Sequence, residues 1–307
     1  MKKILVGLDG SPLAETILPF VEMLAKKTGA RVTLLHVVPP PDQGPSAGAD
    51  HPAIDQMVRA STQRAEGYLA EQRRRFAATG LGASIEVVAG PAAHEIVSHA
   101  ERGGYDLIAL ATHGRSGVER WTHGSVADQV LHATKIPLLL VRPGDGWQAV
   151  PREPHRLVLM LDGSPESETA LDLAVPLATR FSLPLLLFRF VEPIALEFGD
   201  PLGTAYADVE RITNATAESA LDHLETLATT LRKEKGVNAS AKVAVAGPAE
   251  GITAYVRDHP DSLVVLTTHG RTGWRRALLG SVARRVVQSV AAPILICPAR
   301  MAPVVSA

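Results

Sequence analysis

Two glycine-rich segments of the chain have the residue types and spacing needed to bind phosphate. Residues 112–125 read THGRSGVERWTHGS, and residues 268–281 read THGRTGWRRALLGS. Free backbone N–H groups in such a loop form a concavity for anions, and a helix that starts after the last glycine adds the positive end of its dipole. The residues that we assign to these two phosphate-binding loops are Gly114, Gly117, Gly124 and Ser125 in the first, and Gly270, Gly273, Gly280 and Ser281 in the second.

Basic side chains accompany both loops. Arg115 and Arg271 follow the first glycine and bring a permanent positive charge with planar, forked donors. His113 and His269 precede that glycine. Each histidine could contact phosphate or act as a base, or could only hydrogen-bond within its own turn, and the residue types leave this choice open.

A second shared block, LDGSP, contains Asp9-Gly10 and recurs at Asp162-Gly163. An Asp-Gly-Ser-Pro sequence is typical of a turn that leads into a helix. A carboxylate at a phosphate site can also hold the metal ion of the ligand, directly or through water. We keep both interpretations for Asp9 and Asp162.

These blocks belong to an internal duplication. VAGP at 88–91 recurs at 245–248, and the apolar segment IPLLLV recurs as APILIC. The matched blocks keep the same order and nearly the same spacing, so the chain is two copies of one domain. We predict domains at residues 1–143 and 156–307, joined by a Pro-, Gly- and charge-rich linker at 144–155.

Within each copy, apolar runs alternate with helical patterns. Near-continuous apolar strands between helices indicate a buried parallel sheet. The fold class is therefore α/β, with two tandem doubly wound, Rossmann-like domains that each hold a five-stranded parallel sheet. In the first copy we expect strands at 3–8, 31–38, 84–89, 106–111 and 137–141, and helices at 12–28, 52–79, 92–102 and 125–133. Ligands of such folds bind beyond the carboxyl ends of the strands.

Composition limits the possible functions. The 307 residues carry a formal net charge of −1, which argues against a general nucleic-acid or membrane-surface binder. The single cysteine, Cys297, excludes an intrachain disulfide and a cysteine zinc site, and we expect it to be buried in a strand. No apolar stretch approaches the roughly 20 residues that span a bilayer. We expect a soluble, cytoplasmic protein without a metal site of its own.

Catalytic signatures are missing from the sequence. It contains no Walker A motif, no dinucleotide-binding GxGxxG motif and no GxSxG nucleophile turn. The binding groups are thus present without a visible nucleophile and base. We expect ligand binding with, at most, slow hydrolysis.

The two loops resemble those of the universal stress protein family. Its ATP-binding members show Gly, two residues, Gly, nine residues, then Gly and Ser or Thr, and the second and third parts of this pattern match both loops. The resemblance covers nearly the whole chain and implies ATP, with Mg²⁺, as the ligand. By resemblance, Asp9, Gly10, Asp162 and Gly163 lie at the ATP site, Val126 and Val282 follow the last motif residue, and Val37 and its counterpart Phe190 meet the adenine.

The chain departs from the family pattern at the first glycine, which is Ala111 in one copy and Thr267 in the other. We expect the β-branched threonine to narrow the second pocket. Two alternatives to an ATP-binding signalling module therefore stay open. They are a weak ATP hydrolase and a nucleotide-free dimerising scaffold.

Family members also pair through their last strands. By resemblance, the two copies could form an intrachain pseudo-dimer through residues 137–141 and 293–297, and a homodimer could use the same edge.

Overall fold

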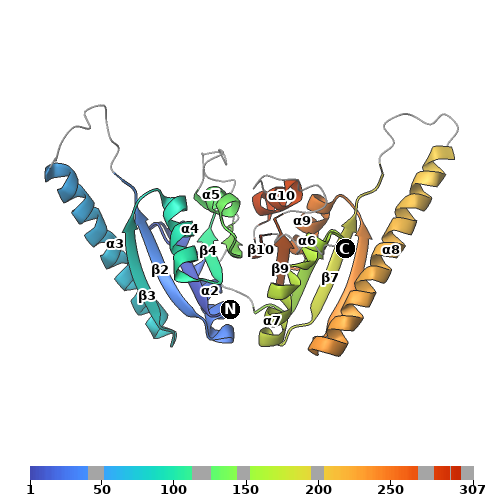
Figure 1. The fold of residues 1–307 in the computed structure, drawn as a ribbon, viewed down its shortest axis with the longest axis horizontal. Coiled ribbons are helices and arrows are strands. Elements are labelled where there is room, and N and C mark those ends of the chain that lie inside the picture. The colour runs from blue at the N-terminus through green and yellow to red at the C-terminus, as the bar shows by residue number, and fades with distance from the viewer. Residues whose placement is uncertain are drawn as a thin grey trace, which may run out of the picture. The chain divides into compact units, whose positions relative to one another are not determined.

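The computed structural model describes residues 1–40, 52–112, 126–143, 153–194, 204–268, 280–290 and 292–298. The chain divides into two compact units, Met1–Pro151 and Arg152–Ala307, and each is a parallel sheet covered by helices (Figure 1). In the described part of the chain, no helix combines the length and the apolar character needed to cross a membrane.

Unit 1 alternates strands and helices along the chain. Its elements are β1 (Lys3–Gly7), α1 (Pro12–Glu15), α2 (Leu18–Thr28), β2 (Arg31–Val38), α3 (Pro52–Ala78), β3 (Ala83–Ala89), α4 (Ala92–Gly103), β4 (Leu107–Ala111), α5 (Val126–Ala133) and β5 (Leu138–Val141). The strands lie in the order β3-β2-β1-β4-β5, and every neighbouring pair is parallel. The chain thus starts in the middle of the sheet, extends it to β3, and returns to the other side of β1 with β4.

Unit 2 repeats this plan. Its elements are β6 (Arg156–Leu161), α6 (Pro165–Glu168), α7 (Leu171–Phe181), β7 (Leu185–Val191), α8 (Thr204–Lys235), β8 (Ala239–Val245), α9 (Pro248–Asp258), β9 (Ser262–Thr267), α10 (Ser281–Ser289) and β10 (Ile294–Cys297). The order β8-β7-β6-β9-β10 is again wholly parallel. The predicted α/β fold, with five parallel strands in each copy, is confirmed.

The central strands are apolar because helices cover both of their faces. Ile4, Leu5 and Val6 of β1 are fully buried, as are Leu157, Val158 and Leu159 of β6. Cys297 lies buried at the end of β10, as predicted.

Each sheet has one group of helices on either face. Glu15 of α1 accepts hydrogen bonds from Gln72 and Arg75 of α3, at 2.9 Å each, so α1 and α3 lie on the same face of the unit 1 sheet. On the other face, α4 packs against α5, and α9 packs against α10 in unit 2. In each unit, helices therefore border the carboxyl ends of the central strands on both faces of the sheet.

The helix predicted at 12–28 is wrong in one respect, because it divides into α1 and α2. At the break, the Thr16 hydroxyl donates to the Leu13 carbonyl at 2.6 Å, and Pro19 in the first turn of α2 has no N–H to continue the earlier helix. Unit 2 breaks at the matching Thr169, whose hydroxyl donates to the Glu166 carbonyl at 2.6 Å, although the proline of α7, Pro176, lies inside the helix and not in its first turn. The threonine, shared by both copies, is thus the common feature of the break.

Candidate functional site

The loops after β1 and β6 have the same conformation at the carboxyl edge of each sheet. Asp9 Oδ1 accepts the Ser11 N–H at 2.9 Å, and Asp162 Oδ1 accepts the Ser164 N–H at 3.0 Å. Gly10 and Gly163 both have φ of 86°, a region that favours glycine. Ser11 and Ser164 then cap the following helices through their hydroxyls. Each aspartate therefore shapes its turn, and its carboxylate stands at the strand end.

In unit 1, a pocket of about 100 Å³ lies beside this turn. Asp9, Val37, Ala111 and Val126 line it, together with Ile96 of α4. The pairing of β1 with β2 and β4 brings these residues together from distant parts of the sequence. Four of the predicted site residues thus meet at one edge of the sheet.

In unit 2, the corresponding pocket has a volume of about 280 Å³. Asp162, Phe190 and Thr267 line it from the ends of β6, β7 and β9, and Pro248 and Ile252 of α9 form an apolar wall. Binding sites for small molecules usually begin at roughly 300 Å³, so this pocket approaches that size. The larger of the two pockets is the one that contains Thr267, and the local narrowing expected from this threonine stays a prediction.

The start of α10 forms one end of the unit 2 pocket. Gly280, Ser281, Val282 and Ala283 all line it. Gly280 is the N-cap and has no side chain that could cap the helix; the first intrahelical bond runs from the Arg284 N–H to the Gly280 carbonyl, at 3.0 Å. The N–H groups of the first turn precede that bond and have no partner within the helix. They provide donors for an anion, with the helix dipole behind them.

A backbone hydrogen bond closes the segment that leads into α10. The Gly280 N–H donates to the Thr268 carbonyl at 2.7 Å, while the Thr268 N–H donates to the Cys297 carbonyl at 2.9 Å. Thr268 and Gly280 are therefore held together, and both line the pocket.

Phe190 occupies space that a glycine makes available. A Cβ on Gly251 of α9 would lie 2.4 Å from Cε1 of Phe190, far inside the van der Waals contact distance. The centroid of the Phe190 ring lies 4.5 Å from that of Phe188. The Phe188 ring in turn meets the Tyr255 ring edge-on, with their centroids 5.1 Å apart. The ring is thus packed against α9, and it lines the pocket without filling it.

Unit 1 has a different pair at the same positions. Val37 stands where unit 2 has Phe190, and Glu95 stands where it has Gly251. In unit 1 the Glu95 side chain lies against Gly90, with its Cγ 2.7 Å from the place of a Cβ on that glycine. The pocket of unit 2 has the aromatic Phe190 in its wall, and that of unit 1 has the aliphatic Val37.

The structure accounts for the predicted residues in three groups. Asp9, Val37, Ala111 and Val126 line the unit 1 pocket, and Asp162, Phe190, Thr267, Gly280, Ser281 and Val282 line the unit 2 pocket. Gly10 and Gly163 shape the turns, and Gly163 faces a separate groove described below. The remaining predicted residues lie outside the described part of the chain: His113, Gly114, Arg115, Gly117, Gly124, Ser125, His269, Gly270, Arg271 and Gly273.

Three contributors to the unit 2 site were not predicted. Glu192 lines the pocket just after β7, Ile252 forms its wall, and Gly251 makes room for Phe190. The repeated VAGP block marks the start of this helix in both copies, but its register aligns Gly251 with His94, whereas the pockets align Gly251 with Glu95.

The profile of the universal stress protein family matches residues 1–142 and 154–298. The chain belongs to the universal stress protein family. The two matches correspond to the two copies of the domain, so this is a tandem member.

Relatives of this universal stress protein include both tandem and single-copy chains. A universal stress protein of Mycolicibacterium smegmatis is 26% identical over 301 residues, which cover 95% of this chain and 96% of the relative. One from Methanocaldococcus jannaschii is 31% identical over 142 residues, covering 46% of this chain and 82% of the relative. The crystal structure of a universal stress protein from Archaeoglobus fulgidus shares the fold, with a TM-score of 0.70, 18% identity, and coverage of 97% and 98% of the two chains.

The packing of Phe190 against Gly251 predicts strong coupling between these two positions. Gly251→Leu should destabilise unit 2 when Phe190 is present, because the new side chain overlaps the ring, but much less in a Phe190→Val background. We expect a coupling free energy of about 1–3 kcal/mol from a double-mutant cycle in urea. The cycle cancels the gain in helix propensity that replacing glycine brings.

The matched control is Glu95→Leu at the equivalent position of unit 1, which should change the free energy of unfolding by about 0.5 kcal/mol or less. Additive effects of Gly251→Leu and Phe190→Val would show that the contact does not constrain the ring.

His36 predicts a pH dependence confined to unit 1. Burial lowers the pKa of His36, against the opposing effects of the Asp9 carboxylate and the Leu8 backbone. The unfolded chain, with an ordinary pKa near 6.5, then binds the proton more readily than the folded chain. The stability contribution of neutral His36 is complete above about pH 6.5 and declines as the pH falls below it.

Hydrogen exchange of β1 and β2 peptides, corrected for intrinsic rates, should therefore rise more between pH 7.5 and 5.5 in the wild type than in His36→Gln. The matching β6 and β7 peptides, where Arg189 stands in place of His36, provide the internal control. The same pH response of β2 in both proteins would exclude His36 as its origin.

Proposed function

We propose that this protein binds ATP with Mg²⁺ and acts as a nucleotide-dependent module in stress response or signalling, with little or no catalysis. The observation that carries the proposal is the unit 2 pocket, where an apolar cavity ends at the uncapped start of α10. A nucleotide has the matching shape, with an aromatic base at one end and phosphates at the other.

The aromatic wall supports placing the base near Phe190. Phe190, Ile252 and Leu266 give this part of the pocket an apolar lining. A packed phenylalanine ring presents a flat face on which a purine can stack, and this kind of contact is worth about 1–3 kcal/mol per base. The base would therefore lie between β7 and α9.

The carboxylates and the helix start would receive the polar parts of the ligand. Asp162 and Glu192 both line the pocket and can accept hydrogen bonds from ribose hydroxyls, and Asp162 can also hold Mg²⁺ directly or through water. The N–H groups of Ser281 and Val282 would meet the phosphates. Gly270, Gly273 and Arg271, which precede α10 in the sequence, would complete the phosphate contacts.

Unit 1 offers a second site of the same design but smaller volume. Asp9 would take the role of Asp162, Val37 that of Phe190, and Val126 marks the helix start. The smaller pocket leads us to expect weaker nucleotide binding in unit 1. Binding at either site would change the surface that the chain presents to partners, including a paired copy held through the last strands.

Analysis of the small molecules released by denaturing the purified protein tests the proposal. Recovery of ATP supports it, and multiple turnover to ADP or AMP would favour an enzyme instead. No released nucleotide, together with no binding at millimolar ATP, would overturn it and leave a nucleotide-free scaffold.

Ser281→Pro provides a sharper test of the helix start. Proline fits the first position of a helix, and the φ of −58° and ψ of 149° at Gly280 suit a residue before proline. The variant removes one phosphate donor while α10 stays intact. We expect ATP affinity in calorimetry to fall about ten-fold, the loss of one charge-assisted hydrogen bond, with unchanged thermal stability.

Ser281→Ala is the matched control, since it removes the hydroxyl but keeps the N–H. An unchanged ATP affinity in Ser281→Pro would show that the start of α10 does not bind the phosphates.

A further inference from the structure

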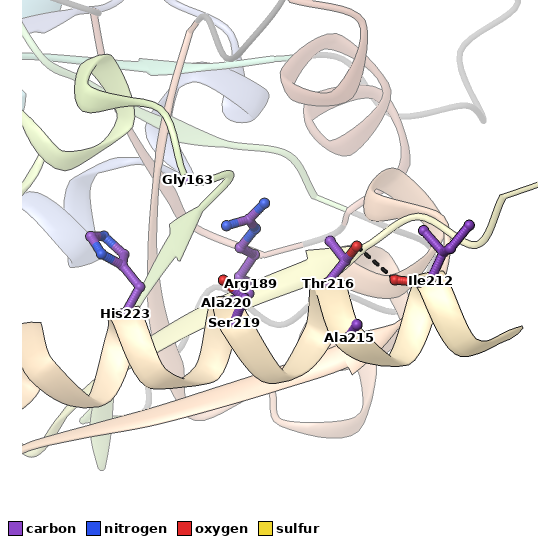
Figure 2. Close-up of a pocket in the computed structure, with 8 residues that line it drawn as sticks. All are labelled: Gly163, Arg189, Ile212, Ala215, Thr216, Ser219, Ala220 and His223. Carbon is purple, nitrogen blue, oxygen red and sulfur yellow. Dashed lines mark hydrogen bonds between the residues drawn. The ribbon is translucent and has the colours of Figure 1, made fainter. Parts of the chain in front are cut away.

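Unit 2 contains a second concavity on the opposite face of its sheet. It is an open groove with about 620 Å³ of space, lined by Gly163, Arg189, Ile212, Ala215, Thr216, Ser219, Ala220 and His223. Figure 2 shows the α8 side chains rising toward the loop at Gly163, with the guanidinium of Arg189 between that loop and the helix. The nucleotide pocket lies on the other face, because successive residues of β7 point to opposite sides. Arg189 therefore faces the groove and Phe190 faces the pocket.

Arg189 gives the floor of the groove a permanent positive charge. A Cβ on Gly163 would lie 2.2 Å from Nη1 of Arg189, so the guanidinium packs directly over the glycine. Its five N–H donors can serve more than one acceptor at once, in a fork that suits phosphate oxygens.

The wall of the groove is one face of α8, and its polarity changes along the helix. His223 stands at one end, with Nε2 2.7 Å from Oε1 of Glu168, which fixes the position of the ring. Ser219 and Thr216 add hydroxyls, and the Thr216 hydroxyl bonds to the Ile212 carbonyl at 2.8 Å. Ile212, 49% exposed, gives the other end an apolar surface. The groove is thus cationic and polar at one end and apolar at the other.

Unit 1 has different side chains at the equivalent positions. The two long helices bury matching residues, Ala65, Leu69 and Phe76 in α3 and Ala220, Leu224 and Leu231 in α8. In this register His223 corresponds to Tyr68, Ser219 to Arg64 and Thr216 to Ser61, while Arg189 of β7 corresponds to His36 of β2. The rings of His36 and Tyr68 meet edge-on at 6.2 Å, and Arg64 donates to the Ser61 hydroxyl at 3.1 Å. The arginine on the strand is therefore a feature of unit 2, whereas unit 1 has its arginine on the long helix.

We propose that the groove between Arg189 and α8 binds a small amphipathic phosphate monoester. Its phosphate would contact Arg189, Ser219 and the His223 ring, and its apolar part would lie along Ala215 and Ile212. The eight residues from Ile212 to Ser219 span about 10 Å of helix, which is enough for a short organic chain. The site is separate from the proposed nucleotide pocket and does not depend on it.

The test titrates isotope-labelled, full-length protein with n-hexyl phosphate, inorganic phosphate and n-hexanol, and follows amide shifts and calorimetry. We expect hexyl phosphate to shift amides of residues 212–223 and of Gly163. It should bind about ten-fold more tightly than inorganic phosphate, because the alkyl chain adds apolar burial. Hexanol should not bind at the same concentrations. Shifts that spare the groove, or equal binding of hexanol, would overturn the proposal.

Variants assign the two ends of the groove. Arg189→Gln should lower hexyl phosphate affinity at least ten-fold, whereas Arg180→Gln, which removes an exposed arginine of α7, should leave it unchanged. Ile212 lies on the helix surface, so Ile212→Ser should leave the fold intact. This variant should weaken the binding of hexyl phosphate but not that of inorganic phosphate. Equal losses of hexyl phosphate affinity in Arg189→Gln and Arg180→Gln would show that the effect comes from net charge alone, and would contradict the proposed site.

A sedimentation assay separates a small ligand from a membrane. Vesicles that contain phosphatidic acid should not sediment the protein. Arg189-dependent sedimentation would assign the groove to a lipid surface and overturn the small-molecule class.

Discussion

The parallel pairing of β1 with β4, and of β6 with β9, is the constraint on which both sites depend. It aligns Leu5 with Ile108 in unit 1 and Leu157 with Leu263 in unit 2, so the carboxyl ends of these strands reach the same edge. At this pair the direction of sheet growth reverses, and the helices on either side diverge. Turns, the start of the following helix and short side chains border the opening left there. Both pockets lie at this opening.

Much of the fold could be predicted because duplication supplies the same signal twice. A single glycine-rich turn is ambiguous, but two at matched spacing after matched apolar strands leave little choice of topology. Helix boundaries were less certain. The break at Thr16 depends on one side-chain hydrogen bond to Leu13, and a threonine within an apolar helical pattern does not reveal whether it will form that bond.

The wall of the unit 2 site was harder to predict because it joins residues that are far apart in the chain. Phe190 was predicted as a site residue at the end of a strand, but the position of its ring depends on Gly251, which lies on α9. Arg189, the neighbour of Phe190 in the chain, was likewise not predicted as a site residue. Strand alternation places it on the opposite face, but only the crossing of α8 turns that face into a groove. Such contacts follow from helix placement, which local patterns do not specify.

The two units therefore keep one core and differ at the side chains around it. Buried strands and helix faces have the same residue types in both copies. The differences are concentrated at Val37 and Phe190, at Glu95 and Gly251, and at His36 and Arg189. These positions lie at the edge of the core, so they change the chemistry of the pocket or groove that they line while the buried strands stay the same.

The contact between Phe190 and Gly251 also limits how the wall of this pocket can change. A side chain at position 251 overcrowds the phenylalanine ring, and a smaller residue at position 190 leaves a void against α9. Substitution of both positions together avoids these defects, so the strand and the helix are constrained here as a pair.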